Sequence, residues 1–254
     1  MNYYIFASDP HGTGQPWIDK VENALKLYPT AQIVFGGDYI DGRKYSRETV
    51  NYVRSKQSEG HIALLGNHEQ LMLNAVMDVQ PELWKINGSK TTIKSFCGRS
   101  WGNEQAARMF AYYNKDVIAW ARALPDIYVT DNIVFVHAGL DFSKENPIKD
   151  TSHTDKIWIR DDYIYSMPLV FAHNKIDKTI VTGHTPTVYV IGKFENNLNQ
   201  EIYNVPESCP VISVHYPGEH PRIFTDGGCH SSLPNNTGNV VVLNSDGNLE
   251  KVIF

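Results

Sequence analysis

The chain has 254 residues, of which 42% are hydrophobic, and it carries a formal net charge of −5 with a pI near 6.0. This length and apolar content are sufficient for one large α/β core. Binding along a nucleic-acid backbone normally uses a basic face, and an acidic chain without a basic stretch does not supply one. We therefore expect no nucleic-acid partner.

The N-terminal segment and the cysteines indicate the cellular compartment of the protein. Residues 1–7 contain no basic segment and no long apolar run, so we expect no signal peptide and no membrane span. The three cysteines, Cys97, Cys209 and Cys229, are widely spaced and belong to no motif. This usage is typical of a reducing compartment. We expect a cytoplasmic protein.

The first third of the chain shows the alternation of a layered α/β fold. After Pro16, apolar side chains at Trp17, Ile18, Val21 and Leu25 follow the spacing of an amphipathic helix. We expect strands over residues 3–7, 33–35 and 62–65, and helices over residues 16–28, 47–57 and 68–79.

The middle segment, residues 81–125, is rich in helix formers and aromatic residues and predicts a helical insertion. Its tryptophans, among them Trp84 and Trp101, are interpreted as packing residues rather than as a base-stacking platform. We expect the insertion to form one wall of an active-site cleft and to contribute to substrate choice.

The second half of the chain is dominated by β-branched runs, which predict the strands of a second sheet. The predicted strands cover residues 133–136, 179–181, 188–191, 211–214, 240–243 and 251–254. The Asn-rich stretch 195–207 is expected to be a polar loop or an exposed hairpin.

Five short motifs place metal-competent side chains directly after apolar runs. They are Ser8-Asp9-Pro10-His11-Gly12, Gly37-Asp38-Tyr39-Ile40-Asp41, Gly66-Asn67-His68-Glu69, Val136-His137-Ala138-Gly139 and Thr182-Gly183-His184-Thr185-Pro186. Each alone could be a turn or a core histidine, but small turn residues let several such side chains converge, as a two-metal hydrolytic centre requires. Because the motifs extend from residue 9 to residue 184, we expect residues 1–254 to form a single domain.

The ordered series of these motifs resembles the calcineurin-like metallophosphoesterases. It is most similar to the bacterial and phage branch of the serine/threonine phosphoprotein phosphatases, which also contains symmetrical diadenosine tetraphosphate hydrolases. The resemblance extends to the segments 226–229 and 238–243. It implies a four-layer α/β/β/α sandwich of two mixed sheets flanked by helices.

The resemblance also implies a role for each motif residue. The implied metal ligands are Asp9 and His11 for the first metal, Asp38 as a bridge, and Asn67, His137 and His184 for the second metal. Mixed oxygen and imidazole ligands suit Mn²⁺, Fe²⁺ or Zn²⁺, and we expect two divalent ions, with Mn²⁺ favoured. Such a pair can hold a bridging hydroxide that attacks the phosphoryl group directly. His68 would then protonate the leaving oxygen, and Asp41 would orient His68.

The chain departs from the family pattern at its arginines. Relatives usually read Asp-Arg-Gly where this chain has Asp41-Gly42-Arg43, so the guanidinium that would bind phosphate comes one residue late. Many relatives carry an arginine where this chain has Leu65. Arg160 matches the family's Trp-x-Arg element and is the other candidate phosphate-binding cation, although it could instead pair with one of the two aspartates that follow it.

One element of the insertion also resembles bacterial relatives. The segment Asn87-Gly88-Ser89-Lys90-Thr91-Thr92 follows a tryptophan, as does an Asn-Gly-Gly-x-x-Thr element in those relatives, where helical insertions cap the active site. Ser89 replaces the second glycine.

The sequence therefore predicts a metal-dependent phosphatase that acts on phosphate monoesters, with a serine/threonine protein phosphatase as the leading hypothesis. Its partner would be a phosphorylated protein or a small phosphorylated substrate. The alternative is a symmetrical diadenosine tetraphosphate hydrolase or another nucleotide phosphohydrolase. The unusual Arg43 and Leu65 suggest a third hypothesis, a non-catalytic phosphatase-like binding protein, but the implied ligands and His68 are all present.

Overall fold

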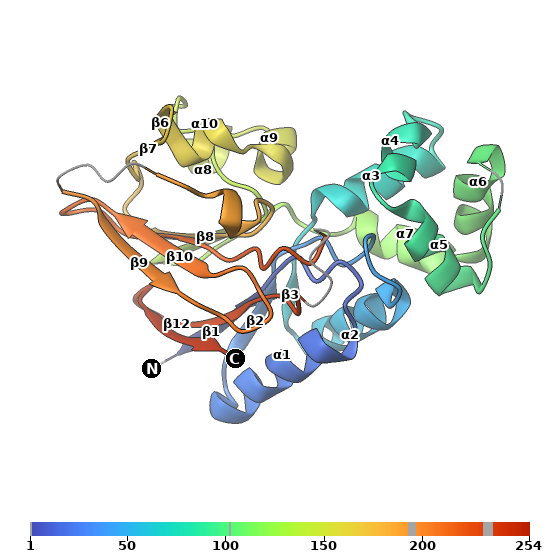
Figure 1. Cartoon of the computed structure of the whole chain (residues 1–254), viewed down its shortest axis with the longest axis horizontal. Coiled ribbons are helices and arrows are strands. Elements are labelled where there is room, and N and C mark those ends of the chain that lie inside the picture. The colour runs from blue at the N-terminus through green and yellow to red at the C-terminus, as the bar shows by residue number, and fades with distance from the viewer. Residues whose placement is uncertain (1, 102, 193–196, 231–235) are drawn as a thin grey trace.

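In the computed structural model the chain forms two mixed β-sheets that stack face to face, with helices on their outer faces (Figure 1). The structure describes residues 2–101, 103–192, 197–230 and 236–254. This arrangement confirms the expected four-layer sandwich. Within these ranges, no helix combines the length and apolar character needed to span a membrane.

The first sheet has the strand order β13-β12-β1-β2-β3. Its strands are β1 (Tyr3–Ala7), β2 (Gln32–Phe35), β3 (Ile62–Ala63), β12 (Val240–Asn244) and β13 (Leu249–Ile253). Because β1, β2 and β3 are parallel, the loops that follow them leave the same edge of the sheet. The prediction that residues 240–243 and 251–254 belong to the second sheet was wrong, since β12 pairs antiparallel with β1. A local apolar pattern predicts a strand, but it does not predict which distant strand this one pairs with.

The second sheet has the order β4-β5-β8-β11-β10-β9. Its strands are β4 (Ile127–Val129), β5 (Ile133–Val136), β8 (Thr179–Thr182), β9 (Asn199–Tyr203), β10 (Val211–His215) and β11 (Arg222–Phe224). Strands β5 and β8 are parallel neighbours, so the two histidine motifs that follow them leave the sheet side by side. A separate hairpin joins β6 (Tyr165–Met167) to β7 (Val170–Phe171).

Two predictions for the second half of the chain have different outcomes. The strand predicted over residues 188–191 was wrong: residues Thr187–Tyr189 form a 3₁₀ helix, η1. Val188, Tyr189 and Ile191 are exposed, and only Val190 of this apolar run packs against the second sheet. In the Asn-rich stretch, β9 pairs antiparallel with β10, which agrees with the exposed-hairpin alternative; residues 195 and 196 lie outside the described ranges.

The helices occupy both outer layers and the insertion. Helices α1 (Gln15–Leu27), α2 (Ser46–Ser58) and α3 (Asn67–Val76) agree with the predictions. The predicted insertion contains α4 (Pro81–Ile86), α5 (Ser89–Cys97), α6 (Asn103–Tyr113) and α7 (Lys115–Arg122). The short helices α8 (Pro147–Asp150), α9 (His153–Trp158) and α10 (Asp161–Ile164) lie with β6 and β7 on the second sheet, opposite the insertion (Figure 1).

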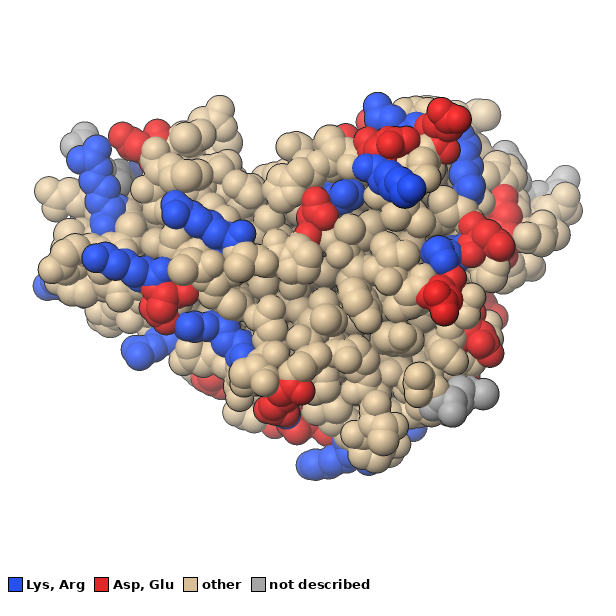
Figure 2. All heavy atoms as spheres, turned by 180° about the vertical axis from the view of Figure 1, so that it is seen from behind, with Lys and Arg blue, Asp and Glu red and all other residues tan. Residues whose placement is uncertain are grey.

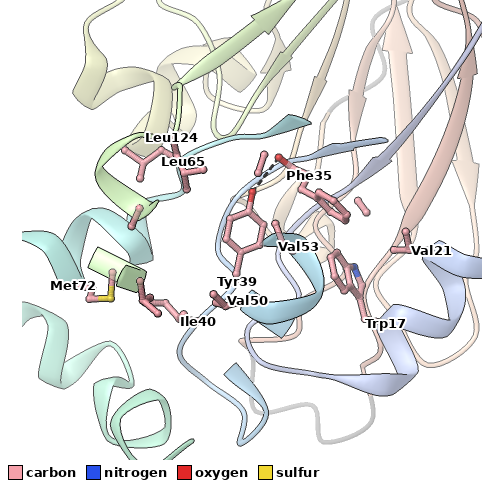
Figure 3. Close-up of a cluster of buried hydrophobic side chains, with 14 of the residues drawn as sticks. Trp17, Val21, Phe35, Tyr39, Ile40, Val50, Val53, Leu65, Met72 and Leu124 are labelled. Atoms are coloured by element: carbon pink, nitrogen blue, oxygen red, sulfur yellow. Dashed lines mark hydrogen bonds between the residues drawn. The ribbon is translucent and has the colours of Figure 1, made fainter. Parts of the chain in front are cut away.

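Strand alternation divides the core into layers. In β1, Ile5 and Ala7 pack towards the helices, whereas Phe6 packs between the two sheets. Figure 3 shows part of the helix-side cluster, in which Trp17 and Phe35 are fully buried. The hydroxyl of Tyr39 donates to the carbonyls of β2 and of the segment after β3, at 3.1 and 2.7 Å. These contacts anchor the loop after β2 to the sheet. This loop carries two candidate site carboxylates, Asp38 and Asp41.

Seen from behind, the molecule has a notch in its upper outline between the helical insertion and the α8–α10 segment (Figure 2). On this face acidic and basic side chains are interspersed among larger uncharged areas.

Candidate metal centre

The backbone of the motif loops adopts a rare conformation. The non-glycine residues Asp9, His11, Asp38, Asp41 and His184 have φ of 53°, 44°, 57°, 67° and 66°. Such left-handed values are uncommon for these residues and persist only where the surroundings enforce them. Hydrogen bonds from the amide of Asp9 to Gly37 O, at 3.1 Å, and from the amide of His11 to Asp38 O, at 3.0 Å, join the loops after β1 and β2. This strain is concentrated where the sequence predicted the site.

The first group of candidate ligands consists of Asp9, His11 and Asp38, whose ligand atoms lie within 4.8 Å of one another. His11 Nδ1 donates to Ile40 O at 3.1 Å. This bond leaves Nε2, which lies 3.5 Å from Asp38 Oδ2, as the atom with a lone pair for a metal. Asp9 is held by Ser8 Oγ and by the backbone amide of the His184 motif. The three side chains are buried and aimed at one point.

The second group consists of Asp38, His137 and His184, again with ligand atoms within 4.8 Å of one another. His137 Nδ1 donates to Gly36 O at 2.7 Å, and its Nε2 lies 3.5 Å from Asp38 Oδ2. His184 donates through Nε2 to a backbone carbonyl of α9 at 3.2 Å, which leaves Nδ1 as its ligand atom. Asn67 Oδ1 lies 3.0 Å from His137 Nε2 and 2.8 Å from His184 Nδ1. The structure thus brings all six predicted ligands together, with Asp38 common to both groups.

The electrostatics of this pocket favour a cation. Burial, with the nearby Asp226 carboxylate, raises the pKa of Asp9 well above its usual range. Although burial alone would raise it, the His137 and His68 imidazoles hold the pKa of Asp38 well below its usual range. Burial alone would lower the pKa of His137, but Asp38 raises it to about 9. Burial and a neighbouring imidazole lower the pKa of His11 and of His184, which keeps these two rings neutral as metal binding requires. The ionised Asp38 carboxylate and the imidazole donors fit Mn²⁺, Fe²⁺ or Zn²⁺.

His68 and Asp41, the predicted acid pair, are hydrogen-bonded to each other. His68 Nδ1 lies 2.8 Å from Asp41 Oδ2, and both side chains are buried. Burial alone would lower the pKa of His68, but Asp38 and the hydrogen bond to Asp41 raise it to about 9. Its Nε2 faces the metal pocket, 4.0 Å from Asp38 Oδ2. A protonated imidazole at this place has the geometry of a general acid.

The helical insertion holds Asp41 in place. Trp84 Nε1 donates to both carboxylate oxygens, at 3.2 and 3.0 Å. Thr92 Oγ1 donates to Oδ1 at 2.6 Å and accepts the Asp41 amide at 2.9 Å. The backbone at Gly88 approaches so closely that a Cβ there would lie 2.9 Å from the nitrogen of Gly42. From the sequence, Trp84 was predicted to be a packing residue only. The Asn-Gly element that ends at Thr92 was the available indication of this contact.

Glu69, the last residue of its motif, does not face the metal pocket. Its carboxylate accepts hydrogen bonds from the amides of Asp38 and Tyr39, both at 2.9 Å, and of Gly66, at 3.2 Å. A buried carboxylate with several amide donors is well satisfied. Glu69 therefore fixes the loop after β2 rather than a metal.

The two candidate arginines lie on different sides of the site. Arg160 Nη1 donates to His184 O and to Thr185 Oγ1, both at 3.0 Å, so it lies beside the second ligand group. Arg43 Nε donates to Cys229 O at 3.0 Å, which joins the loop after β2 to the loop after β11. Contact of either guanidinium with phosphate stays a prediction.

Two residues of the loop after β11 were not identified as site residues from the sequence. Asp226 is buried beside the pocket, where its Oδ1 accepts the amide of Gly228 at 2.8 Å, and burial raises its pKa to about 6. His230 lies against the acid pair, with its ring centroid 4.8 Å from that of His68. The strand-then-glycine pattern of the five motifs recurs at Asp226-Gly227 and was the available indication.

Comparison with known proteins agrees with this geometry. No curated protein sequence matches the chain. A solved structure described as a "putative diadenosine tetraphosphatase" is 16% identical, covers 99% of this chain and 94% of its own, and has a TM-score of 0.56. A protein serine/threonine phosphatase from Saccharomyces cerevisiae with similarity to human phosphatase PP5 is 14% identical, covers 97% and 76%, and has a TM-score of 0.50. At these identities the two structures show a shared fold only.

The family model of the calcineurin-like phosphoesterases matches residues 4–212, a range that includes all six candidate ligands and both members of the acid pair. The chain therefore belongs to the calcineurin-like phosphoesterase family, whose members are metal-dependent enzymes that use a dinuclear centre.

Proposed function

We propose that the chain hydrolyses phosphate monoesters at this centre. The proposed ligands are Asp9, His11 and Asp38 for one metal and Asp38, Asn67, His137 and His184 for the other. The observation that supports this assignment most directly is the sharing of Asp38 by the two ligand groups, because a bridging carboxylate is what two adjacent metals require. When bound, the metals would supply a nucleophile at neutral pH and charge stabilisation for the transferred phosphoryl group.

The protein's own residues supply the proton for the leaving group. His68 donates through Nε2, since its Nδ1 is held by Asp41 at 2.8 Å. Asp41 in turn keeps its orientation through hydrogen bonds from Trp84 and Thr92. The pair therefore delivers a proton from a fixed direction, which is worth about 10²–10⁴-fold in rate for general acid catalysis.

The proposed substrate is a phosphoserine or phosphothreonine side chain in a protein, as the resemblance to the bacterial and phage serine/threonine phosphatases implies. A second candidate is diadenosine tetraphosphate, because the solved structure described as a "putative diadenosine tetraphosphatase" matches along nearly the whole of both chains. A non-catalytic binding role is disfavoured by the complete ligand set and by the acid pair.

The experiment that tests this proposal is a turnover assay with p-nitrophenyl phosphate after reconstitution with Mn²⁺, Fe²⁺ or Zn²⁺. We expect activity with two bound ions per chain and the highest rate with Mn²⁺. The active form is then given phosphoserine and phosphothreonine peptides and diadenosine tetraphosphate, and kcat/KM is compared. The absence of turnover with every metal would leave only the binding role, and a preference for the dinucleotide would select the second candidate.

Two broader assignments belong to the same proposal. All three cysteines carry free thiols, which supports work in the reducing cytoplasm. The ligands come from loops of both sheets, between residues 9 and 184, so we infer that residues 1–254 act as a single domain. Limited proteolysis that released an active fragment lacking the second sheet would contradict this inference.

A further inference from the structure

A third imidazole lies beside the proposed acid. The ring centroid of His230 is 4.7 Å from that of His11 and 4.8 Å from that of His68. His11 and His68 are buried, whereas His230 is exposed. Any substrate that brings its phosphate to the buried pair must leave the rest of its structure on the exposed side, where His230 lies.

The ring of His230 is held along one edge. Its Nε2 donates to the carbonyl of Asn87 at 3.2 Å. Its Cδ2 lies 3.3 Å from the position of a Cβ on Gly42, so a side chain larger than hydrogen would press on the ring. The backbone of the preceding residue, Cys229, accepts the Nε of Arg43. Two other segments, the insertion at Asn87 and the loop after β2 at Gly42 and Arg43, therefore hold His230 and its backbone at the rim of the site.

The opposite side of the ring faces away from these contacts. In an imidazole, Nδ1 is the vertex opposite the Cδ2–Nε2 edge. Because Nε2 carries the proton that is donated to Asn87, Nδ1 of the neutral ring carries a lone pair. Within the described ranges, no hydrogen bond is made by this atom. His230 thus presents a hydrogen-bond acceptor beside His68, as the exposed member of a group of three imidazoles, with His11 and His68, whose ligand nitrogens lie within 4.8 Å of one another.

We propose that His230 is a specificity-determining residue that accepts a hydrogen bond from the leaving group, next to the ester oxygen that His68 protonates. This inference rests on the proposed function and extends it. A phosphoserine residue in a peptide carries backbone N–H groups a few bonds from its ester oxygen, whereas phenyl phosphate carries no donor. His230 therefore favours phosphorylated peptides over simple aryl phosphates.

The test compares His230→Phe, which keeps a ring but removes both nitrogens, with His230→Gln, whose side-chain oxygen can accept a hydrogen bond. Loss of one neutral hydrogen bond predicts that His230→Phe lowers kcat/KM for a phosphoserine peptide about 3- to 10-fold, mainly through KM. The value for phenyl phosphate should stay at the wild-type level, and His230→Gln should recover part of the peptide activity. His220→Ala is the control. His220 is a partly exposed histidine that pairs with Asp177 and precedes β11, whereas His230 follows β11. This variant should keep wild-type kcat/KM for both substrates.

Metal content and phosphate binding complete the test. We expect His230→Phe to keep two metals per chain and the wild-type inhibition constant for inorganic phosphate. Loss of a bound metal in His230→Phe would show that His230 is a metal ligand. An equal loss of kcat/KM for the peptide and for phenyl phosphate would show that His230 supports the site in general. Either result overturns the proposal, as does wild-type kcat/KM for the peptide in His230→Phe. If the wild-type enzyme hydrolyses neither substrate, the proposed function itself fails.

Discussion

Replacing Trp84 by phenylalanine tests whether the helical insertion takes part in catalysis. The indole Nε1 is 3.0 Å from Asp41 Oδ2 and 3.2 Å from Oδ1, and the side chain is 1% exposed. Phenylalanine keeps an aromatic ring in the core and removes only the donor and part of the ring volume. Asp41 then loses one of the two insertion side chains that orient it towards His68.

The size of the effect follows from the kind of bond that is lost. A hydrogen bond to a charged group contributes about 1.5–3 kcal/mol, which corresponds to roughly 10- to 150-fold in rate if it acts fully in the transition state. Thr92 still donates to Oδ1 at 2.6 Å, so Asp41 keeps part of its orientation. We therefore expect kcat to fall about 10-fold, at the lower end of this range.

The assay measures kcat and KM with esters of phenols of graded acidity, together with metal content and thermal unfolding. Trp84→Phe should lower kcat with unchanged metal content, and the loss should shrink for acidic phenols, because these need less help from the acid. The variant should add little to His68→Ala, since the two residues act through one proton.

Trp101→Phe is the control for this assay. Trp101 lines the same cavity of about 350 Å³ in the insertion as Trp84, but it stacks on Tyr113 rather than on the site. It should keep the wild-type kcat. A wild-type kcat in Trp84→Phe, or a loss that is identical for every phenol, would refute the reasoning.

Three further predictions concern the metals, the acid and the arginines. Asp38→Asn should abolish turnover and lower the metal content measured by elemental analysis even with excess Mn²⁺; two tightly bound metals with near-normal activity would disprove the bridge. His68→Ala should lower kcat about 10²–10⁴-fold with metal content nearly intact, and an equal loss for good and poor leaving groups would assign His68 another role. Arg160→Ala should lower kcat/KM for p-nitrophenyl phosphate by the equivalent of about 1.5–3 kcal/mol. In the double mutant Arg43→Ala/Arg160→Ala, the losses of kcat/KM should be non-additive only if both guanidinium groups bind the same phosphate.

The convergence of the candidate ligands could be predicted from the sequence because they stand in short motifs at strand ends. Asp38 follows β2 after two glycines, and His137 follows β5 directly. Within each sheet, parallel strands place such positions at one edge, as β1 and β2 do in the first sheet and β5 and β8 in the second. The role of Trp84 was not predictable in this way. An aromatic side chain in a helical segment is most often buried because of its large apolar surface. Only the three-dimensional position of the indole N–H of Trp84 shows that it donates to Asp41.

The pairing of the last strands shows a second limit. Residues 240–243 have the pattern of a buried strand, and the structure contains that strand, but its partner is β1 at the other end of the chain. The choice between the two sheets depends on which faces meet in the final packing, as at Val241, which lies between them. No local pattern contains that information.

The hydrogen bonds from Trp84 and Thr92 to Asp41 have a consequence for exchanging the insertion of this chain with that of a relative. In this chain, an insertion without these two donors would leave Asp41 as a buried carboxylate whose remaining side-chain partner, among the described residues, is His68. Chimeras that swap residues 81–125 between relatives should therefore remain active only when the donor segment carries its own tryptophan and threonine at these places.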